Sequence, residues 1–261
     1  MKANVMMKTL SLAVLGLAGM SFAGASMAQC PTTIGQNQTP AGVWSAALQT
    51  QAALSVATPG LNSTACKMRT ALNQNSSASA KAGAVDQTPN AEQRYRARYL
   101  ISTAIALTQL NRTALTFNVV GPTAAPGGTQ NALQIFLLGS GSARQLRFLI
   151  GDTAAAGQYR QLDVPLPNQA GANRVEIDLT FAAGAGTNGQ LRYWVTDAAT
   201  ATTDGAPTGT VTGLANGAWG GVDQVVLGLG GANNAWRTNF TATDFVDFDE
   251  FDSRRQSFIG Q

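Results

Sequence analysis

Apolar and polar residues alternate through much of this chain, and this period of two limits the possible fold more than any other feature of the sequence. The clearest run covers residues 174–181, where the apolar positions are Val175, Ile177, Leu179 and Phe181. Because successive side chains of a β-strand point to opposite faces, such a run forms a strand with one face in a core and the other toward solvent. Related patterns predict further strands at residues 94–99, 115–119, 133–138, 146–150, 160–164, 191–195 and 225–229.

The segments between these runs are rich in glycine and asparagine, which favour turns. Asn188-Gly189 predicts a tight hairpin between the two strands that flank it. Residues 133–138 are almost continuously apolar, which predicts a strand that is covered on both faces. About ten short antiparallel strands joined by such turns indicate an all-β sandwich or jelly roll.

The first 28 residues have the pattern of a secretory signal peptide. Lys2 and Lys8 give the segment a basic start, residues 10–20 form an apolar run too short to span a bilayer, and residues 26–28 end it with small side chains at the cleavage positions. We expect cleavage before Gln29 and a secreted or periplasmic protein. No second long apolar stretch follows, so no membrane insertion is expected after cleavage.

The rest of the chain divides into two parts. Residues 29–89 are rich in Ala, Ser, Thr, Asn and Gln, with weak strand patterns near 53–56 and 66–69. This composition predicts a loop-rich segment that adds one or two strands to the sandwich. Residues 90–261 carry the regular alternation and are expected to form the β-sandwich core, and a chain of this length fits one all-β domain.

Two cysteines follow the predicted signal peptide, Cys30 and Cys66. An even pair in an exported protein predicts a disulfide. A loop of this size would be expected to stabilise the fold by roughly 3–4 kcal/mol.

Composition excludes several classes of function. The chain has no histidine, which removes the usual Ser-His-Asp and Cys-His catalytic arrangements and the commonest zinc ligand. The net charge is +3 for the whole chain, and two of the basic residues, Lys2 and Lys8, leave with the signal peptide. A nearly neutral mature chain argues against a nucleic-acid partner, which would require a basic surface.

The closing segment combines acidic and aromatic residues. Its acids are Asp244, Asp247, Asp249, Glu250 and Asp252, and three Phe residues are interleaved with them. These Phe residues recur every three positions, which a regular strand cannot place on one face. We therefore predict a closing strand with a bulge near Asp249-Glu250.

The order of several motifs resembles a known superfamily. These motifs are PNAEQRYRARY at residues 89–99, RVEID at 174–178, GQLRYWV at 189–195, VVLG at 225–228 and FDEFDSRR at 248–255. Over roughly residues 66–260 the chain resembles the concanavalin A-like (laminin G-like) jelly-roll sandwiches, above all their uncharacterised secreted bacterial members. The resemblance implies lectins, glycan-binding modules, glycosidases or adhesion domains, and the fold does not choose among them.

Tryptophans are the first candidates for a ligand site. Trp194 shares a strand face with Arg192, and Trp219 and Trp236 lie in Gly- and Asn-rich segments. Aromatic rings displayed in this way could stack on a sugar, and we take these four residues as candidate ligand-binding residues. The alternative is ordinary burial, which is common for tryptophan.

A row of three arginines is the second candidate. Arg94, Arg96 and Arg98 lie on one face of a predicted strand and could bind the carboxylate or sulfate groups of an acidic glycan. Like charges on one face repel, so the alternative is neutralisation within the fold by acids of a neighbouring strand. The acids that could neutralise the arginines are Asp247, Asp249 and Asp252.

Two groups of carboxylates are candidates, one for catalysis and one for metal binding. Glu176 and Asp178 share a strand face, as do the catalytic acids of some glycosidases of the superfamily. The third carboxylate position of that pattern is occupied by Thr180, so no catalytic residue is predicted. The preferred interpretation of the two acids is an exposed strand face. Asp247 and Asp249 are candidate ligands for Ca²⁺, which prefers oxygen donors. No other cofactor is expected.

These observations favour an exported, non-catalytic β-sandwich for recognition or adhesion, with a carbohydrate or another surface protein as partner. A structural, self-assembling subunit is the first alternative. An unusual glycan-degrading enzyme is the second.

Overall fold

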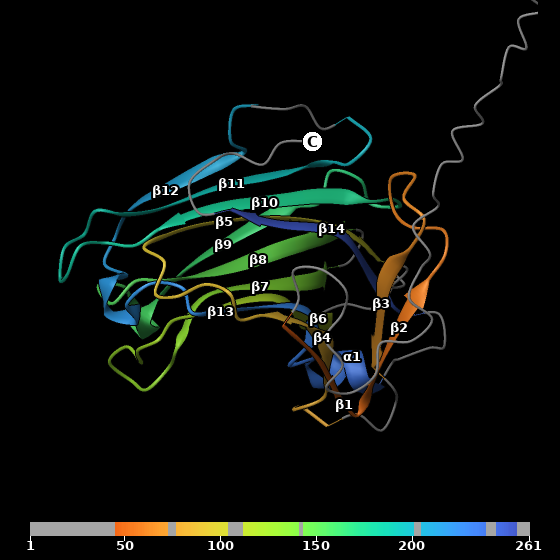
Figure 1. The fold of residues 1–261 in the computed structure, drawn as a ribbon, viewed down its shortest axis with the longest axis horizontal. Coiled ribbons are helices and arrows are strands. Elements are labelled where there is room, and N and C mark those ends of the chain that lie inside the picture. Colours follow the sequence, from red (N-terminus) through yellow and green to blue (C-terminus); the bar gives the residue numbers. More distant parts are fainter. Residues whose placement is uncertain are drawn as a thin grey trace, which may run out of the picture.

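Two antiparallel sheets of seven strands pack face to face in the computed structural model, which describes residues 45–72, 77–103, 112–140, 143–200, 205–238 and 244–254 (Figure 1). Fourteen strands are present in these ranges, with one short α-helix and two 3-10 turns. The architecture confirms the predicted all-β jelly-roll sandwich. Among the described residues, no helix has the length and apolar character needed to cross a membrane.

Sheet A contains the lower strands in Figure 1. In spatial order they are β1 (Ala46–Thr50), β4 (Lys81–Asp86), β13 (Gln224–Gly230), β6 (Arg112–Val120), β7 (Asn131–Ser140), β8 (Ala143–Gly151) and β9 (Tyr159–Pro165). Strands β6 to β9 follow one another in the chain and form a meander. Strand β13 lies between β4 and β6, so a late segment of the chain closes the middle of the sheet.

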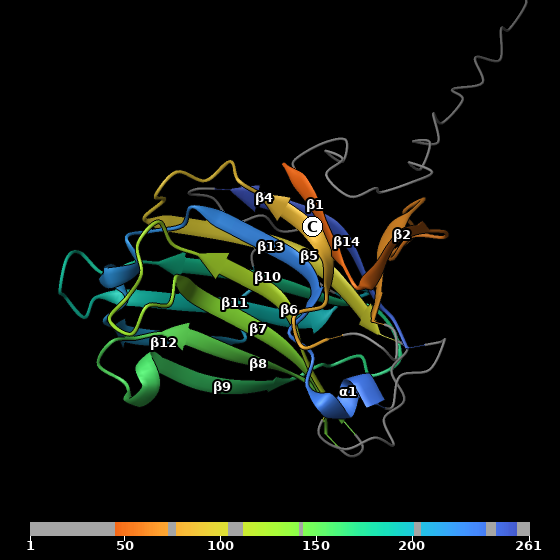
Figure 2. The same cartoon turned by 90° about the horizontal axis from the view of Figure 1, so that it is seen from below.

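Sheet B forms the upper layer in Figure 1 and continues down the right side of the molecule. In spatial order they are β12 (Gly209–Leu214), β11 (Gly189–Asp197), β10 (Asn173–Thr180), β5 (Arg94–Thr103), β14 (Val246–Arg254), β3 (Lys67–Leu72) and β2 (Ala52–Ala57). The helix α1 (Asn234–Thr238) lies at one end of the sandwich, and the 3-10 turns are Ala156–Gln158 and Gly217–Trp219 (Figure 2). Strands β5 and β14 are neighbours although the chain separates them widely.

The core fills the space between the sheets with the inward side chains of both. The alternating residues of β10 behave as predicted, since Val175, Ile177 and Leu179 are all fully buried. Aromatic contacts join the sheets across this space: the rings of Tyr99 and Phe117 stack with centroids 5.2 Å apart. Such contacts add to the free energy gained from burying apolar area.

The N-terminal part contributes more strands than the sequence predicts. Four strands, β1 to β4, lie between residues 46 and 86, and they complete one end of both sheets. They are five or six residues long and rich in Ala, so the alternation of large apolar residues that marks other strands is weak. Their strand conformation depends on pairing with β13 and β14.

The connection between β10 and β11 is longer than the predicted tight hairpin. Strand β10 ends at Thr180 and β11 begins at Gly189. The connection is held by the Asn216 side chain, whose Oδ1 accepts the Ala182 N–H at 2.7 Å and whose Nδ2 donates to the Thr180 carbonyl at 3.1 Å. Contacts to a distant residue therefore override the local turn signal.

The predicted bulge in the closing strand is confirmed. The register of β14 against β5 shifts between Asp249 and Asp252, and Glu250 has a φ of 48°. The extra residue resets the alternation, so Phe248 is fully buried and Phe251 also packs against the core. A regular strand would have turned one of these rings to the outer face.

The predicted disulfide and signal peptide lie largely outside the described residues. Cys66 is partly buried just before β3, and Cys30 lies outside the described ranges together with residues 1–28. The Cys30–Cys66 pairing therefore stays a prediction.

A buried ion pair links the two sheets. Arg112 begins β6 in sheet A, Asp244 precedes β14 in sheet B, and Nη1 of the arginine lies 3.0 Å from Oδ2 of the aspartate. Both side chains are almost fully buried. Removing one partner leaves a buried charge without its counterion, so we expect Arg112→Ala to lower the free energy of unfolding by about 3–5 kcal/mol in urea titrations.

Two controls make this prediction specific. Arg147→Ala breaks an ion pair whose side chains are one-third exposed and should cost at most about 1 kcal/mol. The double variant Arg112→Met/Asp244→Leu replaces the charges by apolar groups and should recover much of the loss. A cost below about 1 kcal/mol for Arg112→Ala would contradict a structural role for the pair.

Candidate functional site

Three of the four predicted ligand-binding arginines meet on the outer face of sheet B, where they surround one carboxylate. The fourth, Arg98, lies with its Nη2 3.9 Å from Oε2 of Glu250. The strand register places Asp178 of β10 opposite Arg96 of β5 and Arg192 of β11. Arg94 binds Asp178 through two hydrogen bonds, Nε–Oδ1 at 2.9 Å and Nη2–Oδ2 at 3.0 Å. Arg96 donates to Oδ2 at 2.9 Å, and Arg192 donates to the same oxygen through both Nε, at 3.0 Å, and Nη2.

Arg94 and Arg96 are therefore neutralised within the fold, as the alternative interpretation predicted. The acid that neutralises them is not Asp247, Asp249 or Asp252. Asp178 supplies the charge because β10 is the neighbour of β5 along this whole face. Asp178 is 2% exposed, and Glu176 beside it is also fully buried. The preferred interpretation of these two acids as an exposed strand face is therefore wrong, because both acids are buried and arginine side chains surround Asp178.

The candidate tryptophans are buried. Trp219 and Trp236 are 0% exposed and belong to the core, where Trp219 lies beside the ring of Tyr159 with centroids 6.1 Å apart. Trp194 is 4% exposed, and its Nε1 donates to the Gly205 carbonyl at 2.8 Å. The rings are therefore not displayed for sugar stacking. Burying a large apolar ring is favourable, and this outweighs the tendency of a Gly-rich segment to lie at the surface.

Asp247 and Asp249, the candidate calcium ligands, each bind donors of the protein itself. Asp247 accepts Nε and Nη2 of Arg69, both at 2.8 Å, and lies 3.1 Å from Nζ of Lys67. Asp249 accepts the Leu61 N–H at 2.8 Å and the Thr64 hydroxyl. Within the described ranges no group of three or more potential metal ligands gathers around one point.

The outer face of sheet A offers a more accessible surface, and Figure 2 views the molecule from that side. Two rows of side chains cross it perpendicular to the strands. The first row, read from β6 to β9, is Leu115, Phe136, Arg147 and Asp163. The second row is Asn118, Gln134, Leu149 and Gln161.

These rows are partly exposed because the alternate residues of the same strands fill the core. On β7, Leu133, Ile135 and Leu137 are buried, whereas Gln134 and Phe136 are only partly covered. Strand β7 was predicted to be covered on both faces, and the structure covers only one. A continuous apolar run predicts burial of both faces only if every apolar residue in it is buried. Phe136 interrupts that rule, because this apolar side chain lies on the outer face and is only partly covered.

Arg147 and Asp163 hold each other in a fixed orientation on this face. Two parallel hydrogen bonds, Nε–Oδ1 and Nη2–Oδ2, are both 2.7 Å long, and each side chain is one-third exposed. The hydrogen bond from Arg147 lowers the pKa of Asp163, so the carboxylate remains ionised. The pair therefore presents a donor and an acceptor next to the ring of Phe136.

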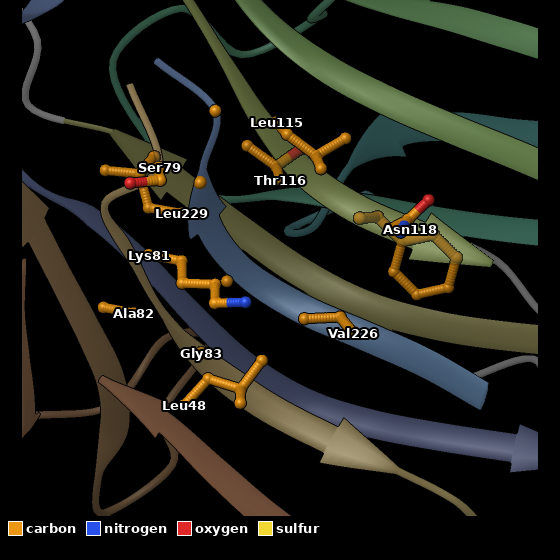
Figure 3. Close-up of a pocket in the computed structure, with 14 residues that line it drawn as sticks. Leu48, Ser79, Lys81, Ala82, Gly83, Leu115, Thr116, Asn118, Val226 and Leu229 are labelled. Carbon is orange, nitrogen blue, oxygen red and sulfur yellow. The ribbon is translucent and has the colours of Figure 1, made fainter. Parts of the chain in front are cut away.

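A groove of about 210 Å³ continues this surface over β1, β4, β13 and β6 (Figure 3). Its floor is backbone, since Gly83 and Gly228 are paired in the register of β4 and β13. A Cβ at Gly228 would lie 2.3 Å from the Gly83 Cα, and the φ of Gly228 is 149°, so a side chain fits here neither in space nor in conformation.

The walls of the groove combine apolar and polar side chains. Leu48, Leu115 and Val226 provide apolar surface, and Asn118 joins the groove to the amide row. Figure 3 shows the Lys81 side chain lying across the groove toward Val226. From β4 to β9 the groove and rows extend over about 24 Å, from five inter-strand spacings of about 4.8 Å.

Sequence reasoning missed this surface. The outward positions of each strand were readable from the alternation, but their assembly into rows depends on which strands are neighbours and in which register. The available signal was the presence of Asn118, Gln134 and Arg147 at outward positions of three successive strands.

Comparison with known proteins identifies the fold. No protein-family model and no curated protein matches this chain. Among solved structures, it is similar to an endo-β-1,4-glucuronan lyase from the fungus Trichoderma reesei, with a TM-score of 0.55 and 13% identity over 84% of this chain and 94% of the lyase. It is also similar to a PL-14 alginate lyase from Aplysia kurodai, with a TM-score of 0.52 and 11% identity over 78% of this chain and 87% of that enzyme.

These neighbours are jelly-roll β-sandwiches, in agreement with the two-sheet architecture described above. At such low identity the likeness shows the fold alone. The surfaces that bear on the function of this chain are the outer faces of its two sheets.

The cluster around Asp178 makes stability depend on pH. Burial opposes the charge of this carboxyl, but the hydrogen bonds from Arg94, Arg192 and Arg96 outweigh burial and lower its pKa to about 2. The folded pKa is thus below the ordinary value of about 3.9, so the stabilisation is present above that value and is lost as pH falls toward 2. We expect a loss of about 2 kcal/mol over this range, measured by urea titration at stepped pH.

The variant Asp178→Asn checks the assignment. It should lower the free energy of unfolding by about 3–5 kcal/mol at neutral pH, because it leaves arginines without their counterion, and it should flatten the acid dependence. Asp163→Asn, in a one-third exposed pair, should cost at most about 1 kcal/mol. An unchanged acid dependence in Asp178→Asn would assign the effect to other carboxyls.

Proposed function

We propose that this protein is an exported polysaccharide-binding protein that holds a glycan chain across the outer face of sheet A. The two rows on that face support the proposal most directly. Phe136, Arg147 and Asp163 form one row, and Asn118, Gln134 and Gln161 provide amides in the other. This role is the recognition or adhesion function favoured by the sequence, on a surface that the sequence did not identify.

The chemistry of the two rows suits a sugar chain. A pyranose has apolar C–H faces and a rim of hydroxyl groups, each of which can donate and accept hydrogen bonds. Phe136 with Leu115 offers an apolar platform, while side-chain amides supply both donors and acceptors. Ligand surfaces commonly combine apolar area with a few fixed polar groups in this way.

The length and openness of the surface favour a chain over a single sugar. Together the groove and the rows cross all seven neighbouring strands of sheet A. The two solved neighbours are named as lyases of glucuronan and of alginate, both of which are polysaccharides. Lys81 adds positive charge to the groove, which suits an acidic polymer, whereas the charge of Arg147 is balanced by Asp163.

Export fits this role. The signal-peptide pattern of residues 1–28 supports export of the mature chain, and polysaccharides occur at cell surfaces and in matrices. The nearly balanced charge of the mature chain does not suit a nucleic acid.

Substitution of Phe136 tests the proposal. The mature protein should bind one or more polysaccharides in a glycan array containing glucuronan, alginate and cellulose. Phe136→Ala should weaken that binding about tenfold or more in titration calorimetry, since the ring contributes roughly 1.5–3 kcal/mol of apolar contact. Gln134→Ala should weaken it as well through lost hydrogen bonds.

The matched control is Phe245→Ala. Phe245 is also partly exposed, but its ring lies against Arg69 on sheet B, with 3.4 Å between the ring centroid and Cζ. It should bind glycans as the wild type does. Equal losses in both variants, or no binding to any polysaccharide, would refute the proposal. Concentration-dependent light scattering that disappears in Phe136→Ala would instead support self-assembly through this face.

Lys81 favours a second function, cleavage of an acidic glycan by elimination. Such a reaction removes the proton from the carbon that bears the uronate carboxylate and breaks the glycosidic C–O bond. A carbon–carbon double bond forms, and the departing oxygen takes up a proton from water. An amine in a groove can accept that proton when it is neutral. Absorbance of unsaturated products from alginate or glucuronan, abolished in Lys81→Ala, would establish this role, and activity that survives the substitution would exclude Lys81 as the base.

A further inference from the structure

The edge of sheet B formed by β2 lacks the features that normally protect an edge strand. Strand β2 (Ala52–Ala57) is the last strand of the sheet, and β3 is its one hydrogen-bonded neighbour among the described strands (Figure 1). An edge strand offers its outward N–H and C=O groups to any further strand that approaches it. Proteins usually prevent such pairing with charged side chains, proline or a bulge. The sequence of β2, AALSVA, contains no charge and no proline, and its register against β3 is regular.

The edges on the opposite side of the sandwich are protected. Strand β9, the edge of sheet A on that side, carries Arg160, Asp163 and Pro165. Strand β12, the edge of sheet B on that side, contains Gly213 with a φ of 71°, where its register against β11 shifts. Such a bulge turns an edge away from regular pairing.

Arg160 protects β12 directly as well. Its Nη1 donates to the Thr212 carbonyl at 3.0 Å, and its Nη2 donates to the Gly213 carbonyl at 2.7 Å. The guanidinium group is held in place by Asp152, which is fully buried and accepts a hydrogen bond from Nε at 2.5 Å. These contacts occupy backbone acceptors of β12, so this part of the edge is unavailable to a further strand.

The side chains of β2 would accommodate a further strand. On the outer face Ala53 and Ser55 are small and exposed, and on the inner face Ala52 and Leu54 belong to the core. Val56 follows on the inner face but is only partly buried. The core therefore reaches the edge of the sheet and is incompletely covered there, and a strand added beside β2 would cover Val56 and extend the core.

We infer that β2 pairs with β2 of a second copy of this chain, antiparallel and about a two-fold axis, so that the two B sheets form one continuous sheet. For the inner faces of both copies to lie on the same side, odd-numbered residues must lie opposite odd-numbered ones and even opposite even. Leu54 and Val56 then meet their own kind on the inner face, and Ala53 and Ser55 meet small residues on the outer face. The pattern of β2 is thus complementary to itself.

A second copy fits this edge for two further reasons. Like charges directly opposite each other destabilise a strand pair, and two copies of β2 bring no charges together. Pairing also uses the same edge of both copies, so the contact closes as a dimer. Growth into a longer sheet would require β9 or β12, which are the protected edges.

The dimer would leave the outer face of sheet A accessible. Strand β2 belongs to sheet B, whereas Phe136 and Gln134 lie on β7 of sheet A. Two glycan faces in one dimer would hold a polysaccharide at two points and raise the overall affinity without a new contact. This consequence rests on the proposed function, whereas the pairing of β2 does not.

Sedimentation equilibrium of the mature protein tests the inference. The wild type should show a reversible equilibrium between monomer and dimer, with no larger species. Ala53→Glu/Ser55→Glu should weaken the dimer about tenfold or more, because the introduced charges face each other across the axis. Both residues are exposed, and Ser55 lies opposite Arg69 of β3, so the free energy of unfolding of the monomer should be maintained.

The matched control is Thr210→Glu/Thr212→Glu on the protected edge β12. These residues are also exposed and two positions apart, and Thr210 lies opposite Arg192 as Ser55 lies opposite Arg69. The control should form the dimer as the wild type does. Phe136→Ala should also form it normally, which separates this contact from association through the outer face of sheet A.

Chemical cross-linking locates the contact. A short bis-maleimide should join two copies of Ser55→Cys, because Ser55 lies close to the two-fold axis. It should not join two copies of Thr210→Cys, and the wild type controls for the native cysteines.

Several results would overturn the inference. They are a wild type that stays monomeric at all concentrations, an equal loss of the dimer in the β12 control, a loss of the dimer in Phe136→Ala, or no cross-linking of Ser55→Cys above the wild-type level. Failure of the polysaccharide experiments would leave these expectations unchanged, because β2 contributes no residue to the glycan face.

Discussion

The core between the two sheets takes one face of every central strand, and the placement of all other groups follows from this constraint. Once Val175, Ile177 and Leu179 are buried, Arg174, Glu176 and Asp178 can only lie on the outer face of sheet B. Charged groups crowded on one face must then neutralise one another. Asp178 does so for three arginines at once, which joins β5, β10 and β11 by side chains as well as by backbone hydrogen bonds.

The two outer faces therefore have different characters. On sheet B, ion pairs and the residues after β11 cover much of the charged surface, so most of its arginines serve the fold. On sheet A, amides, an aromatic ring and one fixed ion pair remain accessible beside a groove with a backbone floor. Accessible groups of mixed polarity are what a ligand requires, whereas mutually paired charges have little left to offer one.

The bulge in β14 connects fold and surface. It returns Phe251 to the core after Phe248, and the same extra residue places Glu250 beside Arg98. Asp249, at the start of the bulge, holds the segment that precedes β3. One local irregularity thus satisfies the spacing of the Phe residues and also ties the closing strand to the segment before β3.

The sequence by itself determined the strand type, the inward and outward residues of most strands, and the bulge near Asp249-Glu250, because a period of two depends only on neighbours along the chain. It also identified the Arg94 and Arg96 face as a place where charges meet. It did not identify Asp178 as their partner, the burial of Trp219 and Trp236, or the rows around Phe136. Those outcomes depend on which strands become neighbours. The tertiary structure alone decides the neighbours, because the crossovers between the sheets and the packing of the shared core fix the strand order.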